Sequence, residues 1–460
     1  MIIKNNVTRL FAFFLAIVFI FIILPINSFS TQAAMPDFAG GNGSESDPFL
    51  IETSEQLNNI RYCLNASFKL ISDINLSDTI WQPIGYSEKN SFCGTFDGNN
   101  HFVKNLNLYV STTDIWSSYN VLYVGLFGYA TGTIKNLNIS NAYINVYDHN
   151  HEAYVGVLNG SGSAIIENVS INGKIDCKAG SKDLFIGGVC GKNDGVIQGC
   201  SFDGEIIGST NYEIAQVTAG GISACCNMVL DCNNSGEISL NGYTNNYFSA
   251  GGISGCSGEI SNCYNTGSIN SMFSGGIVGR SGNVKNSYNV GEVVGTYAGG
   301  ICGYGYSSSI INCFNVGNII SSKYGGGIIG QLYSGLLNMC YNIGTITTSV
   351  YSGGIAGGNH GTIYSLENII SGGGEINNCY YVDSIDCGVS LGQDSTHSIS
   401  CEELKNIKTL KNFDFDWKQF WKSFFKRIIC GLHLWIQFFE NHRELLLPRN
   451  CKQWLWSWFF

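Results

Sequence analysis

Carboxylates are the first residues in this chain that could carry out a reaction, because a pair of Asp or Glu side chains is what cleavage of a glycosidic bond requires. In the central part of the chain they do not gather in one segment but occur singly, as Asp176, Asp183, Asp194, Asp203, Asp231, Glu259 and Glu292. The sequence has no Gly-x-Ser-x-Gly nucleophile motif and no His-Glu-x-x-His metal motif. It therefore identifies no catalytic residue and no cofactor-binding residue.

One local cluster has the composition of a metal site, Asp148-His149-Asn150-His151-Glu152. In an extended segment, alternation would put both histidines on the same side, so a metal site is conceivable. The alternative is an exposed insertion between two repeat units, whose extra residues must loop outward. We favour the insertion, so we assign no metal ligand.

Cysteine is frequent, with 18 residues, and in an exported chain this suggests disulfides. The chain has no Cys-x-x-Cys pair, so a zinc site is not indicated. Six cysteines share one position of a repeated unit: Cys200, Cys232, Cys263, Cys313, Cys340 and Cys379. Other copies have Leu137, Val169 or Ser287 there, so we interpret the six as one inward column of thiols that pack as small hydrophobes. We expect them to be mostly reduced, because stacked side chains that point the same way disfavour bridging.

Tyrosine also recurs through the repeats, at Tyr243, Tyr247, Tyr264, Tyr288, Tyr297, Tyr304 and Tyr324. Two arrangements fit this pattern equally well. The rings could form an exposed strip that stacks on sugars, or aromatic ladders inside the fold.

A tandem repeat must position all of these residues. Three consecutive copies begin at Gly251, Gly275 and Gly299, 24 residues apart. Their apolar residues alternate, which is the periodicity of strands. Units this short cannot bury an apolar face alone and must stack on their neighbours. The repeat therefore predicts an all-β fold, a parallel and right-handed β-helix or β-solenoid, with strands roughly 4.8 Å apart.

The Gly-Ile-x-Gly block can be traced in both directions along the sequence, which gives nine copies of its apolar residue. Successive copies are 31 to 33 residues apart in the N-terminal part of the repeat region and 24 to 27 apart in the C-terminal part. That residue, which we expect to point inward, is Leu126, Val157, Val189, Ile222, Ile253, Ile277, Ile301, Ile328 or Ile355.

An amide or carboxylate precedes the cysteine position in seven copies, as Asn136, Asn168, Asp231, Asn262, Asn286, Asn312 and Asn378. Side-chain amides repeated once per rung can bond to one another, so we predict an asparagine ladder at a corner. Four residues after the cysteine position stands a glycine: Gly173, Gly204, Gly236, Gly267, Gly291, Gly317 or Gly344. We expect the chain to turn there through positive φ.

The Gly-Leu/Ile-hydrophobic-Gly core is clearest in Gly125-Leu126-Phe127-Gly128, Gly276-Ile277-Val278-Gly279 and Gly327-Ile328-Ile329-Gly330. It resembles the GLUG motif of secreted and surface-attached bacterial repeat proteins, several of them adhesin-like. The resemblance covers roughly residues 120 to 380 and implies a surface repeat protein. It implies no activity, because no catalytic residue belongs to the motif.

The N-terminal region differs from the repeats. Lys4 and Arg9 precede a short apolar run and small residues, so we interpret residues 1–34 as a signal peptide, with an uncleaved anchor as the alternative. Residues 35–119 are predicted to form an N-terminal cap and the first rungs. They include a short helix that begins after a capping box at Thr53 and Gln56, ends near Leu64 and covers the open end of the solenoid.

The repeats should run through residues 120–383 and end in a C-terminal cap remnant, residues 384–416, with a short helix after Ser400. Residues 417–460 hold six of the eight tryptophans and one of the 58 glycines. We interpret this tail as a frameshifted or otherwise unnatural end, with a membrane-surface segment as the alternative.

Composition limits the function. Without the tail, the chain carries 17 Lys and Arg against 32 Asp and Glu, so nucleic-acid binding is not expected. The hypothesis we favour is an exported, non-enzymatic surface protein that binds glycans or host and matrix proteins, and that meets a membrane only through its signal peptide. The alternative is a carbohydrate-active β-helix enzyme, a polysaccharide lyase or hydrolase.

Overall fold

A computed structural model describes residues 37–111, 121–147, 151–213, 215–242, 247–359, 361–364, 369–382, 387–389 and 396–399. The chain divides into two units, Met1–Asp37 and Phe38–Phe460, and the first lies outside the described residues except for Asp37. The segments predicted as a signal peptide, a short helix after Ser400 and an unnatural tail also lie outside them.

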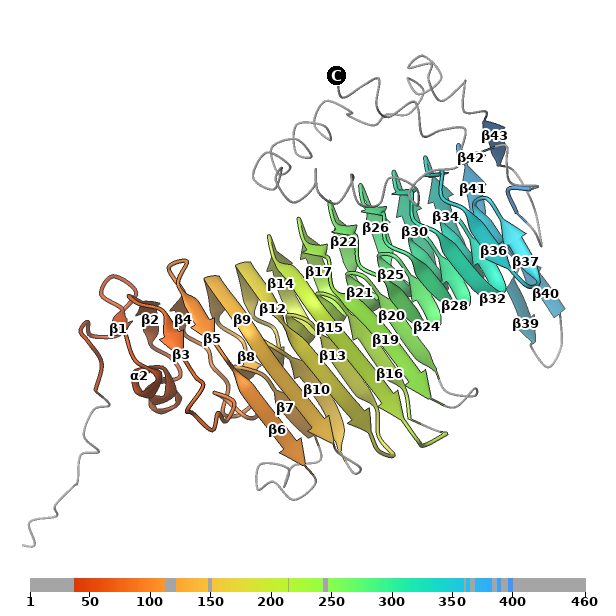
Figure 1. Ribbon diagram of the computed structural model, residues 1–460. Coiled ribbons are helices and arrows are strands. Elements are labelled where there is room, and N and C mark those ends of the chain that lie inside the picture. Colours follow the sequence, from red (N-terminus) through yellow and green to blue (C-terminus); the bar gives the residue numbers. More distant parts are fainter. Residues whose placement is uncertain are drawn as a thin grey trace, which may run out of the picture. The chain divides into compact units, whose positions relative to one another are not determined.

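Parallel strands form most of the described structure. In these residues 41 strands belong to one sheet, and each pairs with its counterpart one repeat away (Figure 1). The fold is thus the predicted parallel β-solenoid, with one short helix near its N-terminal end. Register in the best repeats is one to one: Phe273 pairs with Tyr297, and Val284 with Ile310.

The strands fall into five columns that run along the solenoid. The first precedes the Gly-Gly turn and contains β7 (Val121–Val124), β10 (Glu152–Gly156), β13 (Leu184–Gly187), β16 (Val217–Gly220), β20 (Phe248–Gly251), β24 (Ile269–Gly275), β28 (Val293–Gly299), β32 (Ile319–Gly326) and β37 (Tyr351–Gly353). The second follows that turn and contains β8 (Phe127–Ala130), β11 (Asn159–Gly162), β14 (Cys190–Gln198), β17 (Ser223–Leu230), β21 (Ser254–Cys256), β25 (Val278–Arg280), β29 (Cys302–Gly305), β33 (Ile329–Leu332) and β38 (Ala356–Asn359).

The third column begins with the N-terminal segment and contains β1 (Phe49–Ile51), β2 (Ser67–Leu70), β4 (Thr95–Asp97), β9 (Thr133–Tyr147), β12 (Ile165–Ala179), the ends of β14 and β17, β22 (Glu259–Ser261), β26 (Asn283–Lys285), β30 (Ser308–Ile311), β34 (Gly335–Asn338) and β41 (Glu375–Asn377). The fourth contains β3 (Ile74–Asn75), β5 (Phe102–Lys104), parts of β9 and β12, β15 (Ser201–Thr210), β18 (Asn233–Asn234), β23 (Tyr264–Asn265), β27 (Tyr288–Asn289), β31 (Phe314–Asn315), β35 (Tyr341–Asn342), β42 (Tyr380–Val382) and β43 (His397–Ile399). The fifth column contains β6 (Asn107–Ser111), β19 (Glu237–Gly242), β36 (Ile346–Thr348) and parts of the long strands that also belong to other columns. Outside the columns, β39 (Gly361–Tyr364) and β40 (Ile369–Gly372) form a separate antiparallel hairpin.

The core follows the predicted inward positions. All nine apolar residues of the Gly-Ile-x-Gly block are fully buried, from Leu126 to Ile355. The six column cysteines are also fully buried and unbridged, as predicted. Their thiols do more than fill space, because each donates a hydrogen bond to the carbonyl two residues earlier, as Cys263 does to Ser261 at 3.2 Å. Ser287 does the same at 2.7 Å, which explains why Cys and Ser alternate at this position.

The longer early repeats differ from the expectation that their extra residues only loop outward. Much of the added length extends the strands, so that β9 and β12 have 15 residues each and pair along nearly their whole length. Ile144 and Val146 in this extension are buried, because the extended strands enlarge the core.

The predicted asparagine ladder is present on the outer surface. Asn312 donates from Nδ2 to the Oδ1 of Asn286 at 2.7 Å, and Asn286 donates to Asn262 at 3.3 Å. These residues adopt positive φ of 49 to 56°. The turn therefore uses asparagine, which tolerates this conformation, and not the predicted glycines four residues after the cysteine position.

Those glycines are required by close approach instead. A Cβ on Gly291 would lie 1.9 Å from the carbonyl oxygen of Gly267 one rung away, and one on Gly267 would lie equally close to Gly236. The prediction of positive φ at these glycines was wrong, because φ lies outside the left-handed region at each of them. Adjacent rungs touch here backbone to backbone.

Replacing Gly291 by alanine is expected to destabilise the protein by about 1–3 kcal/mol, because the added methyl must push two rungs apart. Gly282→Ala in the same rung is the matched control, since its Cβ would lie 3.1 Å from the side chain of Val278 and, at ordinary van der Waals distance, 3.6 Å from the Gly258 carbonyl oxygen. Thermal unfolding followed by circular dichroism measures both variants. Equal melting temperatures for the two would contradict the assignment.

A second, buried asparagine ladder was not predicted. It consists of Asn234, Asn265, Asn289, Asn315 and Asn342, all fully buried in the fourth column. The Nδ2 of each of the first four donates to the Oδ1 of the next asparagine at 2.7–2.8 Å, and Asn342 donates to the Gly344 carbonyl. The amides pack against the second glycine of the Gly-Gly turn, where a Cβ on Gly276 would lie 2.3 Å from the Cγ of Asn289. This contact explains the second glycine of the repeated motif.

The N-terminal helix matches the prediction closely. α2 (Ser54–Asn59) continues as the 3-10 turn η1 (Ile60–Tyr62), and Thr53 Oγ1 accepts from the Gln56 amide at 3.2 Å. Leu57 and Ile60 are fully buried in the core, so the helix packs on the first rungs.

Candidate binding site

The first strand column carries a row of aromatic side chains on its outer side. In each strand that has one, the aromatic residue stands two or three positions before the Gly-Gly turn. In register, the residues at this position are Tyr123, Tyr154, Phe185, Thr218, Ser249, Phe273, Tyr297, Tyr324 and Tyr351. We call the seven aromatic residues of this set the aromatic column. Most of these rings are partly exposed, because the residues that flank them point into the core.

The rings stack from rung to rung. Centroids are 4.8 Å apart between Tyr154 and Phe185, 4.9 Å between Phe273 and Tyr297, and 5.2 Å between Tyr297 and Tyr324. Parallel in-register pairing places identical positions about 4.8 Å apart, which is a favourable stacking distance. The backbone therefore imposes the spacing of the rings.

A second set of outward residues lies across the turn, on the second strand column. This facing column contains Tyr129, Ser161, Lys192, Cys225, Cys256, Arg280, Tyr304 and Gln331. Its side chains touch the aromatic column edge to face, with centroids 5.1 Å apart for Tyr123 and Tyr129 and 6.0 Å apart for Tyr297 and Tyr304.

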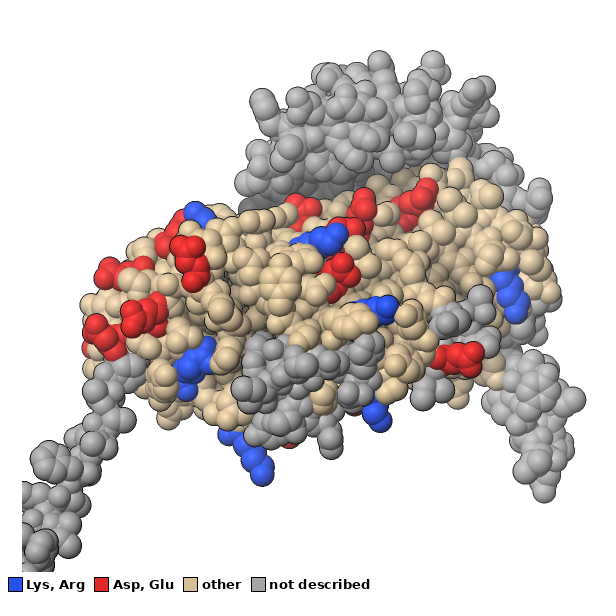
Figure 2. All heavy atoms as spheres, turned by 60° about the horizontal axis from the view of Figure 1, so that its bottom comes forward, with Lys and Arg blue, Asp and Glu red and all other residues tan. Residues whose placement is uncertain are grey.

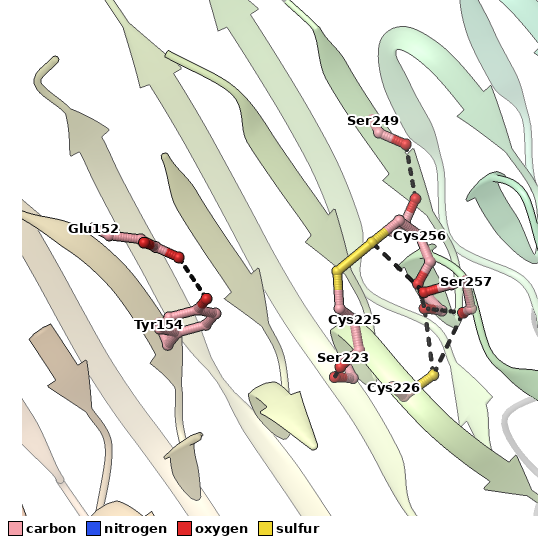
Figure 3. The surroundings of a disulfide bond; sticks show 10 residues. Glu152, Tyr154, Ser223, Cys225, Cys226, Ser249, Cys256 and Ser257 are labelled. Atoms are coloured by element: carbon pink, nitrogen blue, oxygen red, sulfur yellow. Dashed lines mark hydrogen bonds between the residues drawn. A yellow bond between two sulfur atoms is a disulfide. The ribbon is translucent and has the colours of Figure 1, made fainter. Parts of the chain in front are cut away.

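The disulfide between Cys225 and Cys256 lies in the facing column (Figure 3). It joins register partners of adjacent rungs whose Cα atoms are 5.2 Å apart, within the normal range. The expectation of reduced thiols concerned the inward column and does not extend to this partly exposed outward position, where no disulfide was predicted from the sequence. The same two rungs carry the small residues Thr218 and Ser249 in place of aromatic rings.

Cations lie on the aromatic column in the later rungs. The Cζ of Arg280 is 5.7 Å from the ring centroid of Tyr247 and 5.8 Å from that of Phe273. The Nζ of Lys323 is 5.3 Å from the centroid of Tyr324 and 5.8 Å from that of Tyr297. Burial lowers the pKa of the Arg280 guanidinium, and the nearby hydroxyls of Tyr247 and Tyr304 oppose that shift.

The early end of the aromatic column is acidic instead. The hydroxyl of Tyr154 donates to Glu152 Oε1 (Figure 3), and burial together with this bond raises the pKa of Tyr154. Burial, reinforced by Glu88, raises the pKa of Tyr123 to about 12. These hydroxyls therefore stay protonated and act as hydrogen-bond donors at physiological pH.

The candidate residues from the sequence are not brought together. Among the acids, Asp194 pairs with Lys192 at 3.5 Å, Asp231 accepts from Gln198 and Asn262, and Glu259 accepts from Asn283. Figure 2 shows the acidic residues scattered along the face in view. Asp148, His149 and Asn150 lie outside the described residues, and no group of three metal-ligating side chains occurs within the described ranges.

The tyrosines form neither a single exposed strip nor an interior ladder. Tyr297 and Tyr324 belong to the aromatic column, Tyr304 belongs to the facing column, and Tyr243 lies outside the described residues. Tyr264 and Tyr288 belong to a separate stack in the fourth strand column, with centroids 5.2 Å apart and nearly parallel rings. Both stacks could have been found in the sequence, because their members recur once per repeat. Finding the aromatic column requires that Phe185 and Phe273 be included with the tyrosines.

Comparison with known proteins gives limited information. No family model matches the sequence. A protein of Evansella cellulosilytica, named "Putative Gly-rich membrane protein", is 35% identical over 132 residues, which are 27% of this chain and 14% of that protein. This chain therefore matches only a small part of that relative's length. In the described part of this chain, no helix has the length and apolar character needed to cross a membrane.

One solved structure overlaps more widely, that of a "putative immunoglobulin A1 protease from Bacteroides ovatus". The match covers 80% of this chain and 89% of the other, at 22% identity and a TM-score of 0.36. A likeness this weak supports no statement about the activity of the present protein.

Proposed function

We propose that this protein is an exported, non-enzymatic surface protein of the GLUG-repeat type, whose solenoid binds extracellular glycans or matrix proteins. The observation that carries the proposal is the aromatic column, which repeats one outward ring per rung at 4.8–5.9 Å over most of the solenoid. A repeated ring suits an extended ligand, because weak contacts multiply along it. The name of the Evansella relative, a membrane protein, supports a location at the cell envelope.

The chemistry of the surface also favours binding over turnover. Catalysis needs dissimilar groups within hydrogen-bond reach of one another. The carboxylates described above bond to amides and ammonium groups at separate places along the solenoid. Asp231 and Glu259 join neighbouring rungs in this way, and Asp194 pairs with Lys192 of its own strand. The aromatic rings, in contrast, present nearly the same surface from rung to rung.

We expect the purified protein to bind at least one extracellular polysaccharide or matrix protein without cleaving it. Immobilised polymers probed with the protein measure binding, and assays for new reducing ends or unsaturated products measure cleavage in the same samples. Tyr297→Ala should weaken binding several-fold, whereas Tyr288→Ala in the separate stack should not. Cleavage of any polymer would favour the alternative, a carbohydrate-active enzyme.

A further inference from the structure

Two basic side chains on the aromatic column, Arg280 and Lys323, have no acidic partner among the described residues. Lys104, Lys174 and Lys192 each pair with a carboxylate at 2.7–3.5 Å. Arg280 and Lys323 contact only aromatic rings through their charged groups, as far as the described residues show. Other described lysines, such as Lys285, also have no ion pair. What distinguishes Arg280 and Lys323 is that both charged groups lie on the stacked rings of the aromatic column.

Arg280 is also partly withdrawn from water. Its guanidinium lies between Tyr247 and Phe273, and burial opposes its charge. A charge removed from water without a partner is costly, and an anion that pairs with it recovers part of that cost. The site is therefore suited to a negatively charged ligand.

The geometry specifies an extended ligand. Phe273, Tyr297 and Tyr324 belong to three successive rungs, with Arg280 beside the first ring and Lys323 beside the second and third. The two cations are thus separated by up to two rungs, or roughly 10 Å along the solenoid. A polymer lying along the rungs could present one anionic group to each cation. Tyr247, at 54% exposure, extends this surface beyond Phe273.

We propose that the surface formed by Tyr247, Phe273, Tyr297, Tyr324, Arg280 and Lys323 binds a polysaccharide that carries carboxylates, that is, a polymer of uronic acids. Tyr247 and the partly exposed Tyr297 contact the sugar rings, and the two cations pair with carboxylates. Phe273 and Tyr324 are buried and support the two cations. A neutral glycan would leave both cations unpaired, and a globular protein surface would not match the regular rung spacing. This inference rests on the proposed glycan-binding function and adds the class of glycan.

The test uses polygalacturonate and the same polymer with its carboxyl groups fully methyl-esterified, which removes the charges and adds one methyl group to each sugar. By isothermal titration calorimetry with the full chain, we expect the acidic polymer to bind at least tenfold more tightly. Raising the salt concentration should weaken that binding, because screening reduces the attraction between partly exposed charges. Arg280→Gln and Lys323→Gln should each reduce affinity for the acidic polymer about fivefold or more and leave the esterified polymer unaffected.

Lys285→Gln is the matched control, because Lys285 is an exposed cation of the same rung as Arg280 on a different strand column. Its affinity should equal that of the unmodified protein, and equal melting temperatures verify that all three variants fold. Equal binding of both polymers, or an equal loss in Lys285→Gln, would overturn the inference while leaving glycan binding intact. Binding of matrix proteins with no binding to either polymer would also overturn it, and binding of no glycan or matrix protein would refute the proposed function itself.

Discussion

Reduction of the Cys225–Cys256 disulfide is expected to lower the free energy of unfolding by roughly 3–4 kcal/mol. The bond closes a loop with a sequence separation of 31 residues, which is one full repeat. In the unfolded chain this closure removes conformational entropy, and in the folded chain it spans two register partners without displacing the backbone. The bond therefore favours the folded state of the fourth and fifth of the nine repeats.

Thermal unfolding with and without a thiol reductant measures this effect. Cys225→Ser should melt like the reduced protein and should no longer respond to the reductant. Cys93→Ser, which removes an exposed free thiol, should behave like the unmodified protein. If the reductant shifts the melting of Cys225→Ser as much as that of the unmodified protein, the stabilisation comes from elsewhere.

The disulfide also shows where prediction from the sequence fails. Cys225 and Cys256 are one repeat apart, and each stands three residues after the inward apolar residue of its repeat, Ile222 or Ile253. Their register could therefore have been read from the sequence. The argument against bridging considered side-chain direction alone. It holds for the inward column, where each thiol donates to a backbone carbonyl, but not for the outward column, where no such bond fixes Cys225 and Cys256.

Fold class and core positions could be predicted because a tandem repeat fixes them many times over. The nine inward residues from Leu126 to Ile355 occupy equivalent positions, and all nine are apolar and buried. The assignment of that position to the core therefore rests on nine copies of the repeat. Backbone conformation was harder to predict from the sequence. Positive φ was predicted at Gly291 and its equivalents, but Asn286 is the residue that adopts it. Glycine is selected at Gly291 by the approach of Gly267, a contact between rungs that depends on where the backbones lie in space.

The candidate binding site could be predicted only in part. The recurrence of tyrosine indicated stacking, but the division into two separate stacks depends on which strand column each residue occupies. Arg280 and Tyr247 come together although one belongs to β25 and the other precedes β20. That contact crosses the Gly-Gly turn between neighbouring rungs, and only the register of the strands reveals it.

Asn289→Ala should destabilise the protein by roughly 2–4 kcal/mol, because it interrupts the buried ladder at its centre. Asn289 accepts from Asn265 at 2.8 Å and donates both to Asn315 at 2.8 Å and to the Gly291 carbonyl at 2.8 Å. Truncation leaves the acceptor on Gly291 without its amide donor and opens a void against Gly276, whose Cα packs on the lost amide. Water cannot readily replace these bonds, since Asn289 is fully buried.

Asn286→Gly in the same rung is the matched control. It removes two bonds of the outer ladder, from Asn286 Nδ2 to Asn262 at 3.3 Å and from Asn312 Nδ2 to Asn286 Oδ1 at 2.7 Å. It keeps a residue that adopts positive φ, and water can replace both lost contacts at this exposed position. We expect this variant to lose less than about 1 kcal/mol. Denaturant unfolding of both variants compares the two ladders directly. A loss in Asn286→Gly as large as that in Asn289→Ala would show that burial does not distinguish them, and that the outer ladder holds the rungs together as strongly as the inner one.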